Sequence, residues 1–487
     1  MAITETASAP PSRLDTRRWL ILAVLCLANF MVILDSQVTI LAVPSIQSAL
    51  QMTPGAAQWV LSANLITFGG MLLLGGRAAD LLGRRRVFMA GTVLFLIVSL
   101  VSGLAWNGEV LIIARALHGV SAALMAPTAL SILTSEFPEG PHRHLALGAW
   151  AGIAGVGATI ALLAGGVLVD VLGWQWIFFL NIPVAIVMLV VSPLLLREST
   201  DVTLRRRYDV AGALSSTAML ALLIYGVQLA PTAGWFAGRT LAVFGAAVAL
   251  LILFVVIESR SEAPLLPLRI LRSNFVVGGN LSMVTMGMLA VGVSVLVSQY
   301  AQGDLLGWSA TEFGLRQAIM PFMAFAGSFI GQRFVTRYGT RAVAVVCLVL
   351  MGVGPGMMIF AVGAGGPFLL IFAAMFFFGS GLGLGTVAAS AAALTGVREN
   401  DLGLASGMNT AAQQIGGGFG VAIVSTVLVS YSTGGTPQAA EMAGYQAGFV
   451  ACVGFALLGL LVTVPLLRGV RRPQPRDPAL EFAVHAD

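Results

Sequence analysis

Long apolar stretches alternate with short polar ones along the whole chain. A helix that crosses a bilayer needs about 20 mainly apolar residues, and fourteen segments meet this requirement. We expect them near residues 19–41, 57–75, 87–105, 110–131, 145–168, 176–196, 210–229, 240–257, 276–299, 313–333, 342–362, 367–394, 403–428 and 446–467. The pattern predicts an all-α integral membrane protein with 14 transmembrane helices.

The basic residues give this layout an orientation. All 26 of them are arginines. If the N-terminus is cytoplasmic, only Arg239 falls in a segment on the opposite side, and Arg115 and Arg316 fall within spans, which leaves 23 on the cytoplasmic side. Cytoplasmic loops of membrane proteins carry such an excess. We therefore expect a multi-pass protein of the cell membrane with both termini in the cytoplasm.

One polar loop occurs twice, 256 residues apart. The segment 75–86 reads GGRAADLLGRRR, and a fainter copy at 331–341 reads GQRFVTRYGTR. Internal repeats of hydrophobic halves are typical of secondary transporters. We therefore expect two six-helix bundles with two inserted central helices. The predicted parts are a tail (1–18), a first bundle (19–196), a linker (197–209), two extra helices (210–257), a second linker (258–275), a second bundle (276–467) and a C-terminal tail (468–487).

The composition excludes several classes of protein. The chain is 58% hydrophobic and 10% charged, whereas a soluble domain carries roughly 25% charged residues. Without lysine the chain has neither a Walker A lysine nor a Schiff-base lysine. The three cysteines, Cys26, Cys347 and Cys452, lie far apart and have no metal-ligand spacing. We expect a protein that is not an enzyme and has no metal and no cofactor.

Three ionisable residues fall inside predicted spans. Asp35 lies in the first, where a charge costs about 2.5–3.5 kcal/mol, and removal from water favours the protonated form of a carboxyl group. Arg115 stays charged and could hold an acid ionised, and His118 lies one helical turn from it. All three are candidates for proton coupling. The alternatives are a structural carboxylate at Asp35, an arginine that reaches the membrane surface at Arg115, and a packing histidine at His118.

Several motifs occur in order on these elements, and together they identify a family. They are Leu34-Asp35, Gly76-x-x-Ala-Asp80-x-x-Gly83-Arg-Arg-Arg86, Arg115-x-x-His-Gly119, the run from Gly173 to Pro183, Pro264-Leu-Leu-Pro-Leu268, Gly403-Leu-Ala-Ser-Gly407 and Gln413-Gln-Ile-Gly-Gly417. With them the chain resembles the major facilitator superfamily, in its fourteen-helix drug–proton antiporter branch. The resemblance implies a bacterial exporter, a monomer in the lipid bilayer, that uses the proton gradient to move small apolar or cationic drugs. It also implies proton-coupling roles for Asp35 and Arg115.

The repeated loop carries the signature motif of the resemblance. Gly76 and Gly83 would permit tight turns and close helix approach, and Arg84, Arg85 and Arg86 would anchor the loop at the cytoplasmic face. The resemblance implies that Asp80 latches the two halves in one conformation, although the loop could serve only as an anchor. Thr336 replaces the aspartate in the second copy, so a latch there should be weaker.

The fifth predicted helix departs from the family. Relatives carry a Gly-Pro pair that is associated with antiport, and Ala161-Leu162 stands in its place. The small residues around it remain, and Gly155, Gly157, Gly165 and Gly166 should allow close helix packing. The missing proline keeps open an alternative function, a proton-coupled symporter or a facilitator for a small metabolite.

Overall fold

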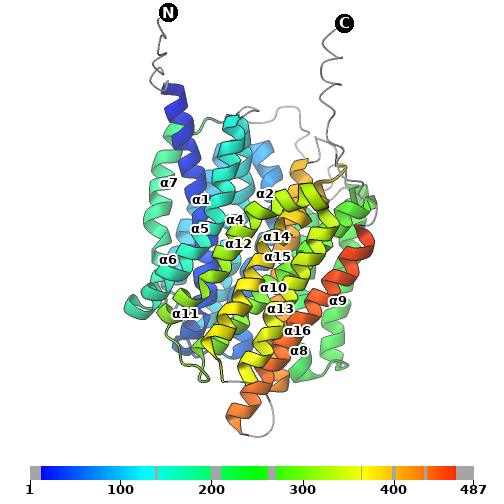
Figure 1. Cartoon of the computed structure of the whole chain (residues 1–487). Coiled ribbons are helices and arrows are strands. Elements are labelled where there is room, and N and C mark those ends of the chain that lie inside the picture. Colours follow the sequence, from blue (N-terminus) through cyan, green and yellow to red (C-terminus); the bar gives the residue numbers. More distant parts are fainter. Residues whose placement is uncertain are drawn as a thin grey trace, which may run out of the picture.

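The chain folds into fourteen helical spans, as the hydrophobic pattern predicts (Figure 1). The computed structural model describes residues 13–137, 141–198, 210–261, 270–363, 365–397, 402–432 and 436–467. The first bundle comprises α1 (Arg13–Ala49), α2 (Pro54–Leu82), α3 (Arg84–Gly103), α4 (Gly108–Glu136), α5 (Pro141–Leu172), α6 (Trp176–Phe179) and α7 (Asn181–Leu195). The last two form one span.

The remaining helices form an inserted pair and a second bundle. The pair consists of α8 (Val210–Ala233) and α9 (Gly238–Arg260), and a short 3-10 turn, η1 (Ile270–Arg272), follows it. The second bundle comprises α10 (Asn274–Gln302), α11 (Ala310–Gln317), α12 (Ile319–Tyr338), α13 (Thr340–Gly363), α14 (Phe368–Leu394), α15 (Leu402–Tyr431) and α16 (Pro437–Leu466). Here α11 and α12 together make one span.

Equivalent helices pack in the same way in the two bundles. In the first bundle α2 and α3 pack on α4, α1 packs on α5, and α3 packs on α7. In the second bundle α12 and α13 pack on α14, α10 packs on α15, and α13 packs on α16. These are the same pairs when the spans of each bundle are numbered in order. The packing therefore agrees with the duplication that the loop repeat predicts.

Between the bundles the contacts are reciprocal. The second span of each bundle packs on the fifth span of the other, through α2 with α15 and through α5 with α11 and α12, while α1 meets α10. The inserted helix α8 packs on both α2 and α15, and α9 packs on α8. The side chains of Leu220 and Ile224 on α8 form one apolar cluster with Ile66 of α2 and Ala422 of α15. One inserted helix thus covers the α2–α15 seam.

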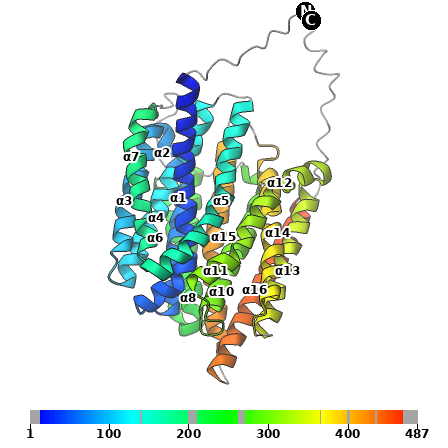
Figure 2. The ribbon, with the colours of Figure 1, turned by 60° about the vertical axis from the view of Figure 1, so that its left-hand side comes forward.

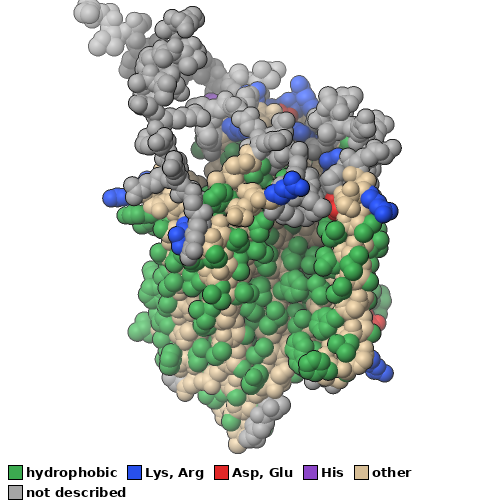
Figure 3. Space-filling model, turned by 90° about the vertical axis from the view of Figure 1, so that its right-hand side faces the viewer, with side chains coloured by type: hydrophobic (Ala, Val, Ile, Leu, Met, Phe, Trp, Pro, Cys, Tyr) green, Lys and Arg blue, Asp and Glu red, His purple; other side chains and the backbone are tan. Residues whose placement is uncertain are grey.

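The two ends of the molecule differ. The start of α1 and the end of α16 lie at one end, called here the terminal end, and the opposite end is called the distal end (Figures 1 and 2). Figure 3 shows hydrophobic side chains over the middle of the molecule and basic side chains concentrated at the terminal end. This is the surface expected of a protein that crosses a bilayer.

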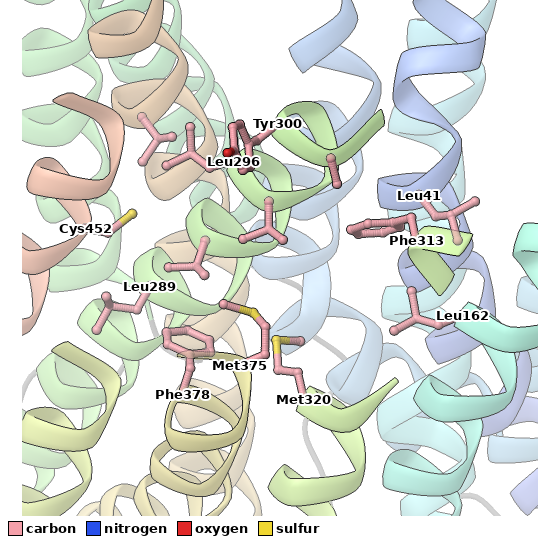
Figure 4. Close-up of a cluster of buried hydrophobic side chains, with 14 of the residues drawn as sticks. Leu41, Leu162, Leu289, Leu296, Tyr300, Phe313, Met320, Met375, Phe378 and Cys452 are labelled. Carbon is pink, nitrogen blue, oxygen red and sulfur yellow. The ribbon is translucent and has the colours of Figure 1, made fainter. Parts of the chain in front are cut away.

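The distal half is closed by apolar packing between the bundles. Leu41 of α1, Leu162 of α5 and Phe313 of α11 are at most 3% exposed and meet in one hydrophobic cluster (Figure 4). The same cluster continues into the second bundle through Met320 and Met375. The bundles are therefore sealed to each other at this depth.

Toward the terminal end α5 and α12 separate (Figure 2). A Cβ atom added at Gly155 would lie 2.5 Å from the Phe325 ring of α12, whereas at Gly152 the same neighbour is 3.8 Å away. At Gly148, one further turn along, nothing lies within 4 Å. The two bundles are thus in contact at the distal half and apart along the terminal half of this seam.

Candidate functional site

A buried ion pair occupies the interior of the first bundle. The Nη1 atom of Arg115 on α4 lies 2.5 Å from Oδ2 of Asp35 on α1, and both side chains are at most 4% exposed. The Nε atom of Arg115 also donates to the carbonyl of Val60 on α2, at 3.2 Å. Arg115 therefore does not reach the membrane surface, and that alternative is wrong. Two of the three predicted intramembrane ionisable residues lie in direct contact.

His118 completes the group. Its Nδ1 atom lies 3.3 Å from Oδ1 of Asp35 and 3.0 Å from Nη1 of Arg115, and its Nε2 atom lies 3.2 Å from the hydroxyl of Ser99 on α3. In a neutral ring, Nδ1 can either donate to the carboxylate or accept from the guanidinium, but not both. A hydroxyl can donate or accept, so Ser99 can serve either tautomer. The imidazole ring is thus held by the carboxylate of Asp35, the guanidinium of Arg115 and the hydroxyl of Ser99.

Aromatic rings enclose His118 and Arg115. Phe95 of α3 stacks on the imidazole with ring centroids 4.9 Å apart. Phe178 of α6 meets the same ring edge-on at 6.1 Å, and the guanidinium of Arg115 lies over the Phe178 ring at 5.8 Å. Both arrangements are favourable for aromatic and cationic groups. These rings exclude water and fix the plane of the imidazole.

The break between α6 and α7 brings a further polar group to the site. Asn181 is the first residue of α7, and its side-chain amide donates to Oδ1 of Asp35 at 3.4 Å. On α2, the amide of Asn64 lies 3.5 Å from the backbone carbonyl of Arg115. Both asparagines are buried. Buried polar groups are usually hydrogen-bonded, and here Asn181 bonds the carboxylate of the ion pair while Asn64 bonds the backbone of Arg115.

The repeated loop adopts the same backbone conformation in both copies. Gly83, between α2 and α3, has φ +104°, and its counterpart Gly339, between α12 and α13, has φ +84°. Only glycine adopts this region without strain. A Cβ atom at Gly83 would also lie 2.2 Å from the Glu198 carboxylate, which pairs with Arg86 at 3.5 Å. The side chain of Asp80, the predicted latch, lies outside the described part of the structure.

The close approach expected at Gly76 occurs at its neighbour. A Cβ atom at Gly75 would lie 2.0 Å from the carbonyl oxygen of Ala123 on α4, whereas at Gly76 the nearest atom, of Pro127, is 3.7 Å away. The sequence could not decide between adjacent glycines because the rotation of α2 about its axis depends on tertiary packing. Of the arginines in this loop, Arg84 also approaches the carbonyl of Ser131 on α4, at 3.5 Å.

The four predicted glycines of α5 divide between two neighbours. Gly157 and Gly165 face α1, where added Cβ atoms would lie 3.0 Å from Phe30 and 2.8 Å from Val38. Gly155 and Gly166 face the second bundle instead, and at Gly166 the contact is with the Ala310 carbonyl at 2.5 Å. The helix therefore packs closely within its own bundle and against the other one.

Sequence reasoning missed the polar contacts between the bundles. In the distal half, Ser298 and Gln302 of α10 donate to the carbonyls of Ile40 and Leu41 on α1, at 3.2 and 3.0 Å. Pro44 has no N–H to bond the Ile40 carbonyl, four residues earlier, and this frees the carbonyl for another helix. That proline was visible in the sequence, but its partner on α10 was not.

A second missed residue is Asp170, near the distal end of α5. Its carboxylate accepts hydrogen bonds from the backbone N–H groups of Ala310 and Thr311 at the start of α11, at 3.1 and 2.7 Å. In the sequence it stands as a lone acid near the end of an apolar run and gives no sign of a partner.

In the part of the chain that the structure describes, no group of three His, Cys, Asp or Glu residues could hold a metal ion. The third charge within a span, Arg316, lies near the distal end over the ring of Trp308, at 4.1 Å, and 3.7 Å from Glu312. It takes no part in the buried site.

Comparisons of the sequence and the fold with known proteins identify the family of the chain. A sequence profile described as Major Facilitator Superfamily matches residues 25–259 and 275–486. The chain is 34% identical to the cephamycin export protein CmcT of Amycolatopsis lactamdurans, with 93% of each chain covered. It is 33% identical to the puromycin resistance protein pur8 of Streptomyces alboniger, covering 93% of this chain and 91% of that protein. Among solved structures, a D-xylose-proton symporter shares the fold with a TM-score of 0.65 at 14% identity, covering 93% of this chain and 98% of the other. The chain therefore belongs to the major facilitator superfamily.

Proposed function

We propose that this protein is a secondary active transporter that exports small-molecule drugs or antibiotics through a bacterial cell membrane, driven by protons. The curated relatives named above are export and resistance proteins and match nearly the whole chain. The observation that carries the proposal of proton drive is the buried contact between Asp35 and Arg115.

A buried ion pair is a suitable place to store and release a proton. Arginine stays charged at any physiological pH, so only Asp35 of this pair can accept a proton. When it does, the attraction that offsets the desolvation of both groups disappears, and Arg115 keeps its bond to the Val60 carbonyl. We propose that this exchange changes the packing of α1 against α4 and thereby links proton binding to the opening of one side. His118 and Asn181 act as positioning residues that hold the Oδ1 atom of Asp35.

The arginine asymmetry supports an orientation. At the terminal end, the helix ends that flank the two copies of the loop carry Arg77, Arg86, Arg333 and Arg341, and the positive-inside rule assigns such an end to the cytoplasm. With that assignment, the separation of α5 from α12 faces the cytoplasm and the apolar packing faces outward. The conformation is then inward-facing in an alternating-access cycle. We propose that the protein works as a monomer and without a cofactor.

The substrate class is inferred from the relatives. Puromycin and cephamycin appear in the names of the two relatives, and one buried apolar cluster of the bundles includes Met283, Met286, Met320 and Met375, a side-chain type that adapts to varied ligands. We propose apolar or cationic compounds as the substrates. A susceptibility panel containing puromycin, with and without the gene, in a host that lacks its own exporters is the first test.

Proteoliposomes test the driving force and the direction. Labelled puromycin should accumulate in inverted vesicles with an acidic interior and collapse to equilibrium when a protonophore is added. If puromycin instead accumulates in vesicles whose exterior is acidic, protons and substrate enter together and the symporter alternative is favoured. The observation that supports this alternative is Ala161-Leu162 in α5. Equilibration that ignores the gradient would identify a facilitator and overturn the proton role.

A further inference from the structure

The carboxylate of Asp170 joins the two bundles at the distal end. Its Oδ1 and Oδ2 atoms accept hydrogen bonds from the backbone N–H groups of Ala310 and Thr311, at 3.1 and 2.7 Å. Asp170 belongs to α5 in the first bundle, and the two amides belong to the first turn of α11 in the second. The first N–H groups of a helix have no partner within the helix, and the positive end of its dipole favours an anion.

The start of α11 is built so that these two amides, and not their neighbours, need an outside partner. The hydroxyl of Ser309 accepts from the Glu312 N–H at 3.1 Å, and the Glu312 carboxylate accepts from the Ser309 N–H at 3.2 Å. This capping box satisfies two of the four terminal amides from within the helix. The remaining two are the ones that Asp170 takes. Its two oxygens thus complete the cap from the other bundle.

Close backbone packing places the carboxylate. One turn before Asp170, a Cβ atom at Gly166 would lie 2.5 Å from the Ala310 carbonyl, and a Cβ atom at Gly314 would lie 2.1 Å from the carbonyl of Leu162. Leu162, Gly166 and Asp170 are spaced by four residues and share one face of α5. Larger residues at either glycine would push α11 away. This face of α5 therefore packs on α11 and places Asp170 at the first turn of that helix.

We infer that Asp170 is a polar latch that, together with the apolar packing of Leu41, Leu162 and Phe313, holds the distal gate shut in the transport cycle. Asp170 can bond both amides only while α5 and α11 are in contact. Opening of the distal side must therefore break both hydrogen bonds. Asp170 is exposed, and water can replace the amides as its partner, which keeps the gate releasable. This role rests on alternating access but on neither the proton site nor the substrate, and it lies at the end opposite the Asp80 loop.

A distance measurement tests the gate directly. Spin labels at Val171 and Leu315, which are 72% and 60% exposed on α5 and α11, would report the separation of the two helices in nanodiscs. In Asp170→Asn the ratio of long to short distances should rise about two- to fivefold, the size of a carboxylate–helix-terminus interaction. Hydrogen exchange in the peptide that contains Ala310 and Thr311 should rise in the same variant.

The control is Asp304→Asn. Asp304 is an exposed carboxylate at the same end, in the connection between α10 and α11 of the second bundle. Its removal should leave both readouts at the level of the parent protein. Unchanged distances and exchange in Asp170→Asn, or an equal shift in Asp304→Asn, would overturn the assignment. The labels report the gate even if no drug is transported, so a failure of the proposed function would be seen separately in the efflux assay.

Discussion

Arg115 and Asp35 form their 2.5 Å contact between α4 and α1, two helices of the same bundle. The pair therefore cannot itself fasten one bundle to the other. Any effect of its protonation on transport must pass through the shape of the first bundle, and α1 is suited to this because its distal half also contacts α10.

Replacing Asp35 by asparagine should abolish proton-driven transport without unfolding the protein. The amide has the shape of the protonated carboxyl group, so the variant should insert and purify like the parent, yet it cannot release a proton. Gradient-driven accumulation of puromycin in proteoliposomes should fall to the level of protein-free vesicles. Undiminished accumulation would remove Asp35 from the mechanism.

Removing the arginine of the pair should destabilise the protein. Arg115→Ala leaves the Asp35 carboxylate buried without its cation, and such losses cost about 3–5 kcal/mol. The double variant Asp35→Asn/Arg115→Ala removes both charges and should recover much of the loss. Thermal unfolding in detergent measures the four members of this cycle. Equal losses in Arg115→Ala and the double variant would contradict the prediction.

His118→Gln should keep transport and its pH profile. The glutamine amide can donate to Asp35 much as the ring does, and a positioning role requires no proton on the side chain. His118→Leu cannot hydrogen-bond to Asp35 or Ser99 and should reduce transport in the same vesicles. A pH profile that moves in His118→Gln would instead show that the imidazole itself carries protons.

Two adjacent glycines offer a matched test of packing. Gly75→Ala should destabilise the protein by about 1–3 kcal/mol, as other overpacking substitutions do, because its methyl group would press on the Ala123 carbonyl. Gly76→Ala meets only an ordinary contact with Pro127 and should be nearly neutral. The two unfolding midpoints in detergent provide the measurement. Similar values for both variants would show that α2 and α4 can separate without cost.

The two copies of the loop should differ in function. Asp80→Asn is expected to impair transport far more than Thr336→Ala, since the sequence supplies a carboxylate in one copy only. The Thr336 hydroxyl donates to the Gln332 carbonyl of its own helix, at 2.9 Å. Equal efflux rates for the two variants would favour the interpretation of the loop as an anchor.

Features encoded by local patterns could be predicted from the sequence. Each span needs only its own apolar residues, so all fourteen were identified, and the glycine turn at Gly83 follows from the loop motif. Asp35 and Arg115 stood out because a charge within a span is costly, and the structure brings them together. Ser99, Asn181 and Asp170 could not be found in this way, because their partners come from distant helices and polar residues of these types are common at helix ends.

The inserted hairpin has a consequence for the motion of the bundles. Since α8 touches α2 and α15 together, a rocking movement leaves it two courses: it travels with one bundle and slides over the other, or it tilts between them. On the contact surface of α8, Leu220 and Ile224 meet Ile66 and Ala422, and the Thr426 hydroxyl of α15 donates to the Val227 carbonyl of α8 at 3.3 Å. A movement in which α8 travels with α15 keeps this hydrogen bond, whereas one in which α8 travels with α2 must break it.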